Sequence, residues 1–373
     1  MTPTAAYIHV PFCAHHCGYC DFAVTAGQDH LFDLYLEALA QELTTLNVPS
    51  PVDTIFIGGG TPTYLDSPRL ERLLKEIDCW LPLCAGGEFS IETTPESLDP
   101  AKVAVLARHG VNRVSIGAQS FHPHLLHTLE RIHDPDAIGR AVACVRKAIS
   151  NVSLDLIFGV PGQSLDEWDA DLRRALAFGP DHLATYGLTY EKGTPLWKQR
   201  ARGAVRALDE DTELAMYERT IDLLEAAGFE HYELSNFARP GRRCRHNQVY
   251  WANQTYYGFG VGAARYVDGC RELNTRDTQL YIRKVLAGET PTFQSETLPP
   301  EERARETIAV QLRRSDGIDR KTFRQQTGYE LDALVGAAVA RLVDLQLLAD
   351  DRQRVRLTRK GKGVADAIIT ELM

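Results

Sequence analysis

The chain has 373 residues, a formal net charge of −9 at pH 7, 44% hydrophobic residues and 24% charged residues. This composition is typical of a soluble globular protein with about two domains. The acidic balance argues against broad nucleic-acid binding, which needs a basic face. The N-terminus has neither the basic nor the apolar region of a signal peptide, and no stretch reaches the ~18 apolar residues of a membrane span. We therefore expect a cytoplasmic protein with reduced thiols and no transmembrane segment.

Strand-like and helix-like segments alternate through the first half of the chain. The strand-like runs are residues 7–10, 54–57, 88–91, 113–117, 153–158 and 182–190. Helical periodicity lies between them, for example over 31–43 and over 164–178, where Ser164 and Glu167 can form a capping box. Six strand–helix units predict a parallel sheet, but a closed barrel needs eight. The pattern predicts an α/β fold: an open, partial (β/α)6 TIM-like barrel over residues 1–237.

The pattern changes after residue 237. A turn-rich basic stretch, a Tyr/Gly-rich region and a breaker-rich linker predict a connecting region over residues 238–298. Residues 299–373 then predict helices near 301–313, 319–326 and 331–346, a hairpin arm at 352–357 and a final helix over 358–372. That order is typical of a winged-helix-like domain. The helix that would enter a DNA groove carries Asp332 and Asp344 against one Arg341, so we expect no nucleic-acid partner.

Cys13, Cys17 and Cys20 form a CxxxCxxC cluster just after the first strand-like run. Three thiolates leave one iron of a [4Fe–4S] cubane without a protein ligand, and a small molecule can chelate that iron. The alternative is a Cys3His zinc site with His15 or His16 as the fourth ligand. Both histidines lie between the thiolates, where the loop cannot easily fold them inward. The spacing therefore favours the iron–sulfur cluster.

Polar and glycine signals collect where the predicted strands end, which is where ligands bind in a parallel β/α barrel. The run Gly58-Gly59-Gly60 follows the second strand and either admits a ligand or makes a tight turn. Glu92 follows the third strand, as a ligand contact or as a charge at a helix N-terminus, and Gln119 follows the fourth strand. Asp155 lies within the apolar fifth strand, so it needs a partner, for which Arg131 is a candidate.

Several strings resemble the coproporphyrinogen oxidase-like branch of the radical S-adenosylmethionine (SAM) superfamily, across nearly the whole chain. They are YIHVPFC, CGYCDF, IFIGGGTPTYL, IETTPESL, NRVSIGAQSF, LERIHD and SLDLIFGVPGQS. The resemblance implies that Cys13, Cys17 and Cys20 hold a [4Fe–4S] cluster. It also implies a set of SAM contacts: Tyr7, Tyr19, Gly60, Thr61, Glu92, Gln119, Arg131, Asp155 and Gly187.

Within that branch, two features separate this chain from the oxygen-independent coproporphyrinogen oxidases. Phe22 stands where those enzymes have a fourth cysteine, and the cluster begins too early to leave room for their N-terminal extension. The chain instead carries an HNxxYW string that resembles the HemW-type haem chaperones, formed by His246, Asn247, Tyr250 and Trp251. Many of those chaperones also have a histidine in the Gly-rich string that follows, where this chain has Ala264.

The resemblance makes His246 a candidate axial ligand to haem iron, with Tyr250 and Trp251 as walls for the macrocycle. Arg239, Arg242, Arg243 and Arg245 are candidate partners of the haem propionates. Without the resemblance, His246 could be purely structural and orient Asn247. Cys244 is a less favoured thiolate alternative.

The function that the resemblance implies is a haem chaperone on a radical SAM scaffold, with a [4Fe–4S] cluster, SAM and haem as cofactors. Such a protein would pass haem to a haem-requiring acceptor, with membrane respiratory proteins as candidates, and it could act as a homodimer. The rival is a catalytic radical SAM enzyme that forms a 5′-deoxyadenosyl radical and modifies a tetrapyrrole or another unsaturated substrate. The cluster and the SAM site are common to both. Phe22 and the HNxxYW string favour a chaperone without coproporphyrinogen oxidase activity.

Overall fold

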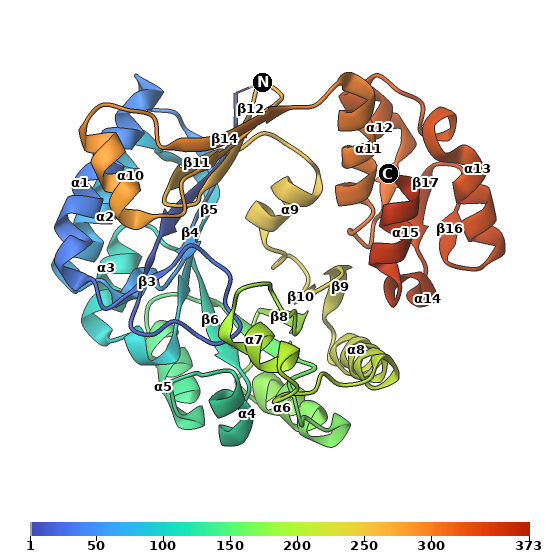
Figure 1. Ribbon diagram of the computed structural model, residues 1–373, viewed down its shortest axis with the longest axis horizontal. Helices are drawn as coiled ribbons and strands as arrows, with labels where there is room; N and C mark the ends of the chain where they lie inside the picture. The colour runs from blue at the N-terminus through green and yellow to red at the C-terminus, as the bar shows by residue number, and fades with distance from the viewer. Residues whose placement is uncertain (1) are drawn as a thin grey trace.

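A sheet of nine strands forms the centre of the molecule (Figure 1). In the computed structural model, which describes residues 2–373, the strand order is β11-β1-β4-β5-β6-β7-β8-β10-β9. Neighbours from β11 to β8 run parallel, and β10 and β9 extend one edge antiparallel. The bounds are β1 Ala5–Val10, β4 Val52–Gly59, β5 Leu83–Thr93, β6 Arg113–Gln119, β7 Asn151–Phe158, β8 His182–Gly187, β9 Glu230–Glu233, β10 Asn236–Ala238 and β11 Tyr257–Gly260.

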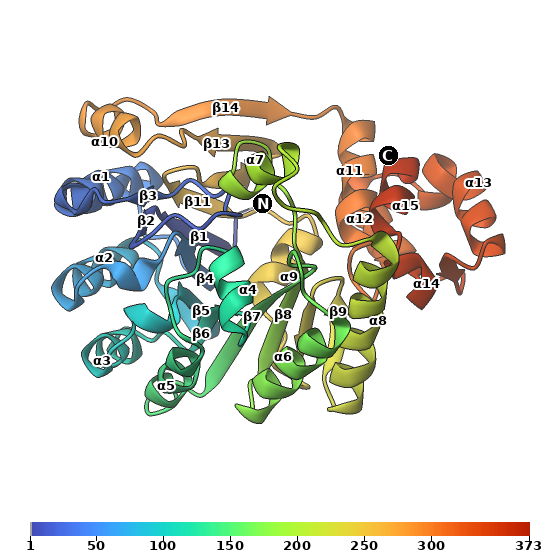
Figure 2. The ribbon, with the colours of Figure 1, turned by 60° about the horizontal axis from the view of Figure 1, so that its bottom comes forward.

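Helices cover the outer face of the sheet, and together with the strands they form an open, TIM-like half-ring (Figure 2). They are α1 Phe32–Leu43, α2 Ser67–Trp80, α3 Pro100–Arg108, α5 Pro135–Val145, α6 Leu165–Ala177, α8 Glu210–Ala226 and α10 Thr278–Leu286. Ile55 and Ile57 of β4 are fully buried in the same core as Leu73 of α2. The predicted capping box is present, with Ser164 and Glu167 bonded reciprocally. The six predicted strands and the partial barrel are thus confirmed.

The segment predicted as a connecting region, 238–298, completes one side of the barrel. Its strand β11 pairs in parallel with β1, and Ile8 lies opposite Phe259. The buried carboxylate of Glu42 on α1 accepts hydrogen bonds from the amide of Gly260 at 2.8 Å and from the hydroxyl of Tyr281 at 2.6 Å. This segment is therefore part of the barrel as well as a connection.

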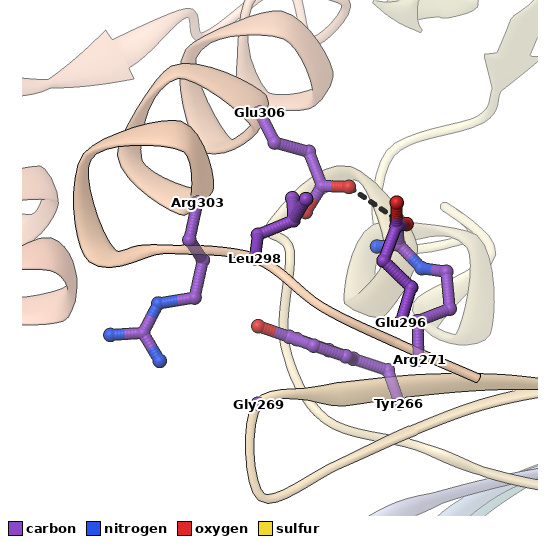
Figure 3. Close-up of a pocket in the computed structure, with 7 residues that line it drawn as sticks. All are labelled: Tyr266, Gly269, Arg271, Glu296, Leu298, Arg303 and Glu306. Carbon is purple, nitrogen blue, oxygen red and sulfur yellow. Dashed lines mark hydrogen bonds and ion pairs between the residues drawn. The ribbon is translucent and has the colours of Figure 1, made fainter.

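A second sheet, β12-β13-β14, leads to the C-terminal domain. Its strands are β12 Ala264–Val267, β13 Cys270–Asn274 and β14 Thr292–Thr297. Arg271 of β13 lies over the ring of Tyr266 and pairs with Glu306 of α11 (Pro300–Gln311), across a small cavity of about 10 Å³ (Figure 3). This contact fixes the second sheet to the C-terminal domain.

The C-terminal domain is winged-helix-like and has a hydrophobic core of its own. It contains α11, β15 Ile318–Asp319, α12 Arg320–Thr327, α13 Leu331–Asp344, β16 Leu348–Asp350, β17 Arg354–Leu357, α14 Arg359–Lys362 and α15 Ala365–Leu372. The predicted single helix over 358–372 is wrong, because α14 and α15 are separate. Gly363 lies at the break, where glycine disfavours a continuous helix. Within α14, a Cβ at Gly361 would lie 2.0 Å from the carbonyl oxygen of Leu347, so glycine allows this helix to pack closely.

Within residues 2–373, no helix is long and apolar enough to cross a membrane.

Candidate functional site

A cavity of about 520 Å³ opens at the carboxyl ends of the central strands. The last residues of β4, β5, β6 and β8 line it: Gly59, Thr93, Gln119 and Gly187. It brings together eleven of the residues predicted for the cluster and SAM: Cys13, Cys17, Cys20, Tyr19, Gly60, Thr61, Glu92, Gln119, Arg131, Asp155 and Gly187. The lining does not include Tyr7 or the HNxxYW residues. The structure therefore separates the two groups of predicted site residues.

The cysteines lie on a loop that is held at both of its ends. Cys13 ends the short strand β2 (Phe12–Cys13), which pairs with β3 (Thr25–Ala26) after the loop. Inside the loop, the amide of Cys20 donates to the carbonyl of Cys17 at 3.2 Å. A Cβ at Gly18 would lie 2.9 Å from the side chain of Glu130, so glycine lets the loop pack closely. This anchoring directs all three cysteines into one cavity.

Two polar side chains reach the sulfurs. The hydroxyl of Thr61 lies 3.5 Å from Sγ of Cys13, and Nη1 of Arg131 donates to Sγ of Cys17 at 3.4 Å. Nη2 of Arg131 donates to the carbonyl of Gly117, and its buried Nε has no hydrogen-bond partner among the described residues. The described residues form no direct ion pair between Arg131 and Asp155, although the charge of Arg131 still lowers the pKa of Asp155. The direct side-chain contact of Arg131 is with Cys17. A guanidinium beside a sulfur suits thiolates that carry a negatively charged cluster.

The thiols do not form a compact metal site. Burial raises the pKa values of Cys13 and Cys20 to about 11, and the neighbouring sulfurs contribute to the rise. A tetrahedral zinc ion with Zn–S bonds of about 2.3 Å would draw its ligands close together. Among the described residues, no set of three cysteine sulfurs lies within a mutual 4.8 Å. His15 and His16 are exposed, and Nε2 of His16 lies 3.0 Å from the carbonyl oxygen of Cys20. This arrangement suits a larger cluster better than a single zinc ion.

The glycine string at the end of β4 is explained by close packing. A Cβ at Gly58 would lie 2.5 Å from the carboxylate of Glu92, and one at Gly59 would lie 2.5 Å from the ring of His9. Gly59 also has a φ of +102°, which side chains rarely allow. The next residue, Gly60, packs on the backbone of the cysteine loop, where its amide donates to the carbonyl of Val10. The string therefore brings β4, Glu92 and the cysteine loop into direct contact.

Glu92 and Asp155 place two half-buried carboxyl groups in the cavity. Burial and, to a smaller extent, the nearby carboxylate of Asp155 raise the pKa of Glu92 to about 7, against the opposing effect of a hydrogen bond from the amide of Gly59. Burial likewise raises the pKa of Asp155 to about 6, against hydrogen bonds from Ser115 and Ser153. Two carboxylates that repel each other in one cavity favour a cationic ligand.

Gln119 sits at a backbone irregularity. Its φ is +63°, and the register between β6 and β7 shifts between Gly117 and Gln119. Left-handed conformations at non-glycine residues and bulges in strands are common beside functional sites. The bulge places Gln119 at the cavity edge.

Tyr7 does not line the cavity, but it lies near the cavity residue Glu92, whose charge adds to the effect of burial in raising the pKa of Tyr7. Its hydroxyl is 3.0 Å from Nδ1 of His9, and its ring stacks on Phe56 with centroids 6.3 Å apart. Phe56 in turn stacks on His246 at 5.3 Å. Tyr7 therefore stands between the cavity and the HNxxYW string.

The HNxxYW string forms the helix α9 (Arg245–Trp251), which packs on β4 and against α11 (Figure 1). His246 is fully buried, with Nδ1 2.9 Å from the hydroxyl of Thr54 and Nε2 2.7 Å from the hydroxyl of Tyr250. Burial lowers the pKa of His246 to about 3, so the imidazole is neutral. The imidazole of His246 packs on the sheet, against Thr54 and Phe56 of β4. Asn247 is half-buried on the same helix.

Glu88 holds the start of α9, a role that the sequence analysis missed. Its carboxylate accepts hydrogen bonds from the amides of Arg245 and His246 at 3.1 Å each, and from the thiol of Cys244 at 3.4 Å. Burial raises the pKa of Cys244 to about 12, which disfavours a thiolate there. The sequence contained a clue to this role, because Glu88 is a charged residue inside a strand, as Asp155 is.

The end of α9 is held by the C-terminal domain. Gln311 donates to the carbonyl of Ala252 at 3.1 Å, and Gln326 donates to that of Asn253 at 2.9 Å. Trp251 lies under the guanidinium of Arg313, and its buried Nε1 has no hydrogen-bond partner among residues 2–373. The helix is thus clamped between the sheet and the C-terminal domain.

The four basic residues before and within α9 already have protein acceptors. Arg239 donates to the carbonyl of Pro180, Arg242 lies near Asp181, Arg243 pairs with Glu230 and Asp316, and Arg245 donates to the carbonyl of Gly86. Pro180 and Asp181 precede β8, at the end of the sheet opposite the cavity. These arginines would have to release their present protein acceptors before they contact haem propionates.

Tyr186 is a cavity residue that the sequence analysis missed. It directly precedes Gly187 at the end of β8, lines the cavity and is 45% exposed. Phe22 also lines the cavity and is 65% exposed. The sequence contained a clue to both, because Tyr186 lies near the end of a strand and Phe22 follows the three cysteines. Together they give the mouth of the cavity an apolar, aromatic character.

Two family models match the chain: the Radical SAM superfamily over residues 7–175 and the HemN C-terminal domain over residues 298–363. Among curated proteins, "Heme chaperone HemW" of Lactococcus lactis is 36% identical, over 96% of this chain and 94% of that protein. The protein of the same name from Bacillus subtilis is 36% identical over 96% of each, and that from Escherichia coli is 38% identical over 70% of each. Among solved structures, coproporphyrinogen III oxidase (HemN) from E. coli superposes with a TM-score of 0.87 at 23% identity, over 99% of this chain and 90% of that one. Because the identity is only 23%, the match to that oxidase shows a shared fold alone.

Proposed function

We propose that this protein binds haem and delivers it to an acceptor protein. The premise is that the chain belongs to the HemW family of haem chaperones, within the radical SAM superfamily. The observation that carries the proposal is the separation of two sites on one barrel. The cavity contains the cysteines and the carboxylates, whereas α9 with the HNxxYW string lies outside the cavity lining. A haem bound at α9 therefore does not compete with a cofactor in the cavity.

We propose that Cys13, Cys17 and Cys20 hold a [4Fe–4S] cluster and that the cavity binds SAM. The unpartnered Nε of Arg131 and the hydrogen bond from Arg131 to Cys17 suit an anionic cluster. Glu92 and Asp155 suit the positive charges of SAM. When bound, a cluster of this kind would supply an electron and an open iron that the ligand can chelate.

We propose that His246 binds the haem iron through Nε2. Its neutral imidazole is the form that coordinates metals. The hydroxyl of Thr54 already occupies Nδ1, and such a partner orients a metal-binding histidine. The hydroxyl of Tyr250 occupies Nε2, so it must leave before iron can bind.

Haem binding then requires α9 to open. His246 is fully buried, and the C-terminal domain holds the end of α9 through Gln311 and Gln326. A movement of the C-terminal domain away from the sheet would expose α9 and free Trp251 to contact the macrocycle. The same movement offers a route by which haem leaves for the acceptor, for which membrane respiratory proteins remain candidates.

The test is an absorbance titration of haem into the reconstituted protein, with a 5′-deoxyadenosine assay in parallel. We expect about one haem per chain in the wild type, and weaker binding or a shifted Soret band in His246→Ala. His30→Ala, which removes an exposed histidine, is the matched control and should behave as the wild type. An unchanged spectrum and affinity in His246→Ala would place the ligand elsewhere. Absence of haem binding together with rapid SAM cleavage would favour the catalytic rival.

A further inference from the structure

Three side chains converge outside the cavity, where α4 (Pro123–Thr128) meets α6. His122 and His124 flank the first residue of α4, and Glu167 lies in the first turn of α6. One ligand atom of each side chain lies within 4.8 Å of the other two. Nε2 of His124 is 3.2 Å from Oε1 of Glu167, and Nε2 of His122 is 3.2 Å from the carbonyl oxygen of Glu167.

This donor set has the chemistry of a transition-metal site. Two imidazole nitrogens and one carboxylate oxygen are ligands that zinc takes in proteins, with a fourth position left to water. Magnesium and calcium prefer oxygen ligands alone, so they fit the two histidines poorly.

The surroundings hold the ligands in place. The second oxygen of the Glu167 carboxylate accepts hydrogen bonds from the amide and the hydroxyl of Ser164, each at 2.9 Å. Oε1 is thereby left to face His124. Nε2 of His122 also lies 3.7 Å from Oδ1 of the buried Asp171, which fixes the preceding loop by accepting the amide of Phe121 at 2.7 Å. Partners of this kind orient the direct ligands of metal sites.

We propose that His122, His124 and Glu167 form a binding site for a divalent transition-metal ion such as Zn²⁺. The ordinary alternative is a pair of polar contacts between two helix ends, and exposed pairs of that kind contribute little to stability. The site is independent of the haem proposal. It lies in the segment between Gln119 at the end of β6 and Arg131, both of which line the cavity. A bound ion would fasten that segment to α6.

The test is a calorimetric titration of Zn²⁺ into the anaerobically reconstituted protein at neutral pH. The cluster must be in place, since free thiols of the cysteine loop would take zinc themselves. We expect one saturable site per chain in the wild type. His124→Ala removes a ligand that is 57% exposed and should fold normally. The loss of a residue that only orients a ligand weakens metal binding by about 10- to 100-fold. We expect His124→Ala, which removes a direct ligand, to weaken zinc binding by at least as much.

Two further variants complete the experiment. Glu167→Gln keeps an acceptor for Ser164 but removes the ligand charge, and it should weaken binding as His124→Ala does. His127→Ala is the matched control, because it removes an exposed histidine of the same helix that is not part of the set. Zinc should also raise the midpoint of thermal unfolding in the wild type and in His127→Ala, but not in His124→Ala. Absence of a saturable site, or equal affinity in the wild type and His124→Ala, would overturn the proposal.

Discussion

The hydroxyl of Tyr250 lies 2.7 Å from Nε2 of His246, and the two rings meet edge to face with centroids 4.9 Å apart. The residues are four positions apart on α9, so the helix itself places them together. The HNxxYW string thus contains both the candidate haem ligand and the group that occupies its free nitrogen. Thr54 holds the other nitrogen and fixes the ring plane.

We expect Tyr250→Phe to bind haem more tightly than the wild type, by roughly 2- to 10-fold. The substitution keeps the aromatic ring but removes a hydrogen bond worth about 0.5–1.5 kcal/mol in the closed state. Nε2 of His246 is then buried without its partner, which favours the open, haem-binding state. Absorbance titration measures the affinity, with Tyr329→Phe in the C-terminal domain as the control. Weaker or unchanged binding in Tyr250→Phe would show that Nε2 is not the ligand atom.

The cluster assignment predicts about four irons per chain after anaerobic reconstitution, with broad absorbance near 400 nm. Cys17→Ala should lose both, because it removes a thiolate that no neighbouring side chain replaces. Cys79→Ala, which changes an exposed cysteine on α2, should keep the full iron content. Stoichiometric zinc in the wild type, or a complete cluster in Cys17→Ala, is incompatible with the assignment.

The strands and the cavity were predictable because both follow local rules. Apolar runs mark the strands, and in a parallel barrel the residues after them meet at one end. That rule placed Glu92 and Gln119 in the cavity. The partner of Arg131 was not predictable in this way, because Cys17 lies 114 positions away in the chain.

The environment of α9 escaped prediction for the same reason. The contacts of His246 with Thr54 span 192 positions, and no local pattern reports them. Strand β11 was also missed, since its short Tyr/Gly-rich sequence gains its strand partner, β1, only when the chain folds back. The sequence made His246 a candidate ligand but gave no indication that its side chain is buried.

Glu88→Ala should destabilise the fold by about 1–3 kcal/mol, because it leaves two helix amides, of which that of His246 is buried, and a thiol without their acceptor. Glu88→Gln keeps one carbonyl oxygen and should lose less. Urea unfolding followed by far-UV circular dichroism gives the free energy of unfolding. Glu37→Ala, at an exposed position on α1, is the control and should stay close to the wild type. If Glu88→Ala matched that control, the carboxylate would not be anchoring α9.

The raised pKa values of Glu92, about 7, and of Asp155, about 6, predict that ligand binding depends on pH. Both values exceed those of the unfolded chain, about 4. The contribution of these groups to stability is therefore fully present below about pH 4 and is lost as pH rises through 6 and 7. A cationic ligand favours the ionised carboxylates, so its binding should strengthen over the same window and release protons.

We expect the affinity for SAM, measured by calorimetry in buffers of different ionisation enthalpy, to rise between about pH 5 and pH 8 in the wild type. Glu92→Gln should bind SAM more weakly, by about 1–3 kcal/mol at neutral pH, because a buried charged partner is lost. It should also show a smaller rise with pH and release fewer protons on binding, since one titrating carboxyl group is gone. Glu37→Gln serves as the control for a charge removed far from the cavity. An identical pH dependence in the wild type and Glu92→Gln would mean that Glu92 does not face the cation, and the cavity would then need a different ligand.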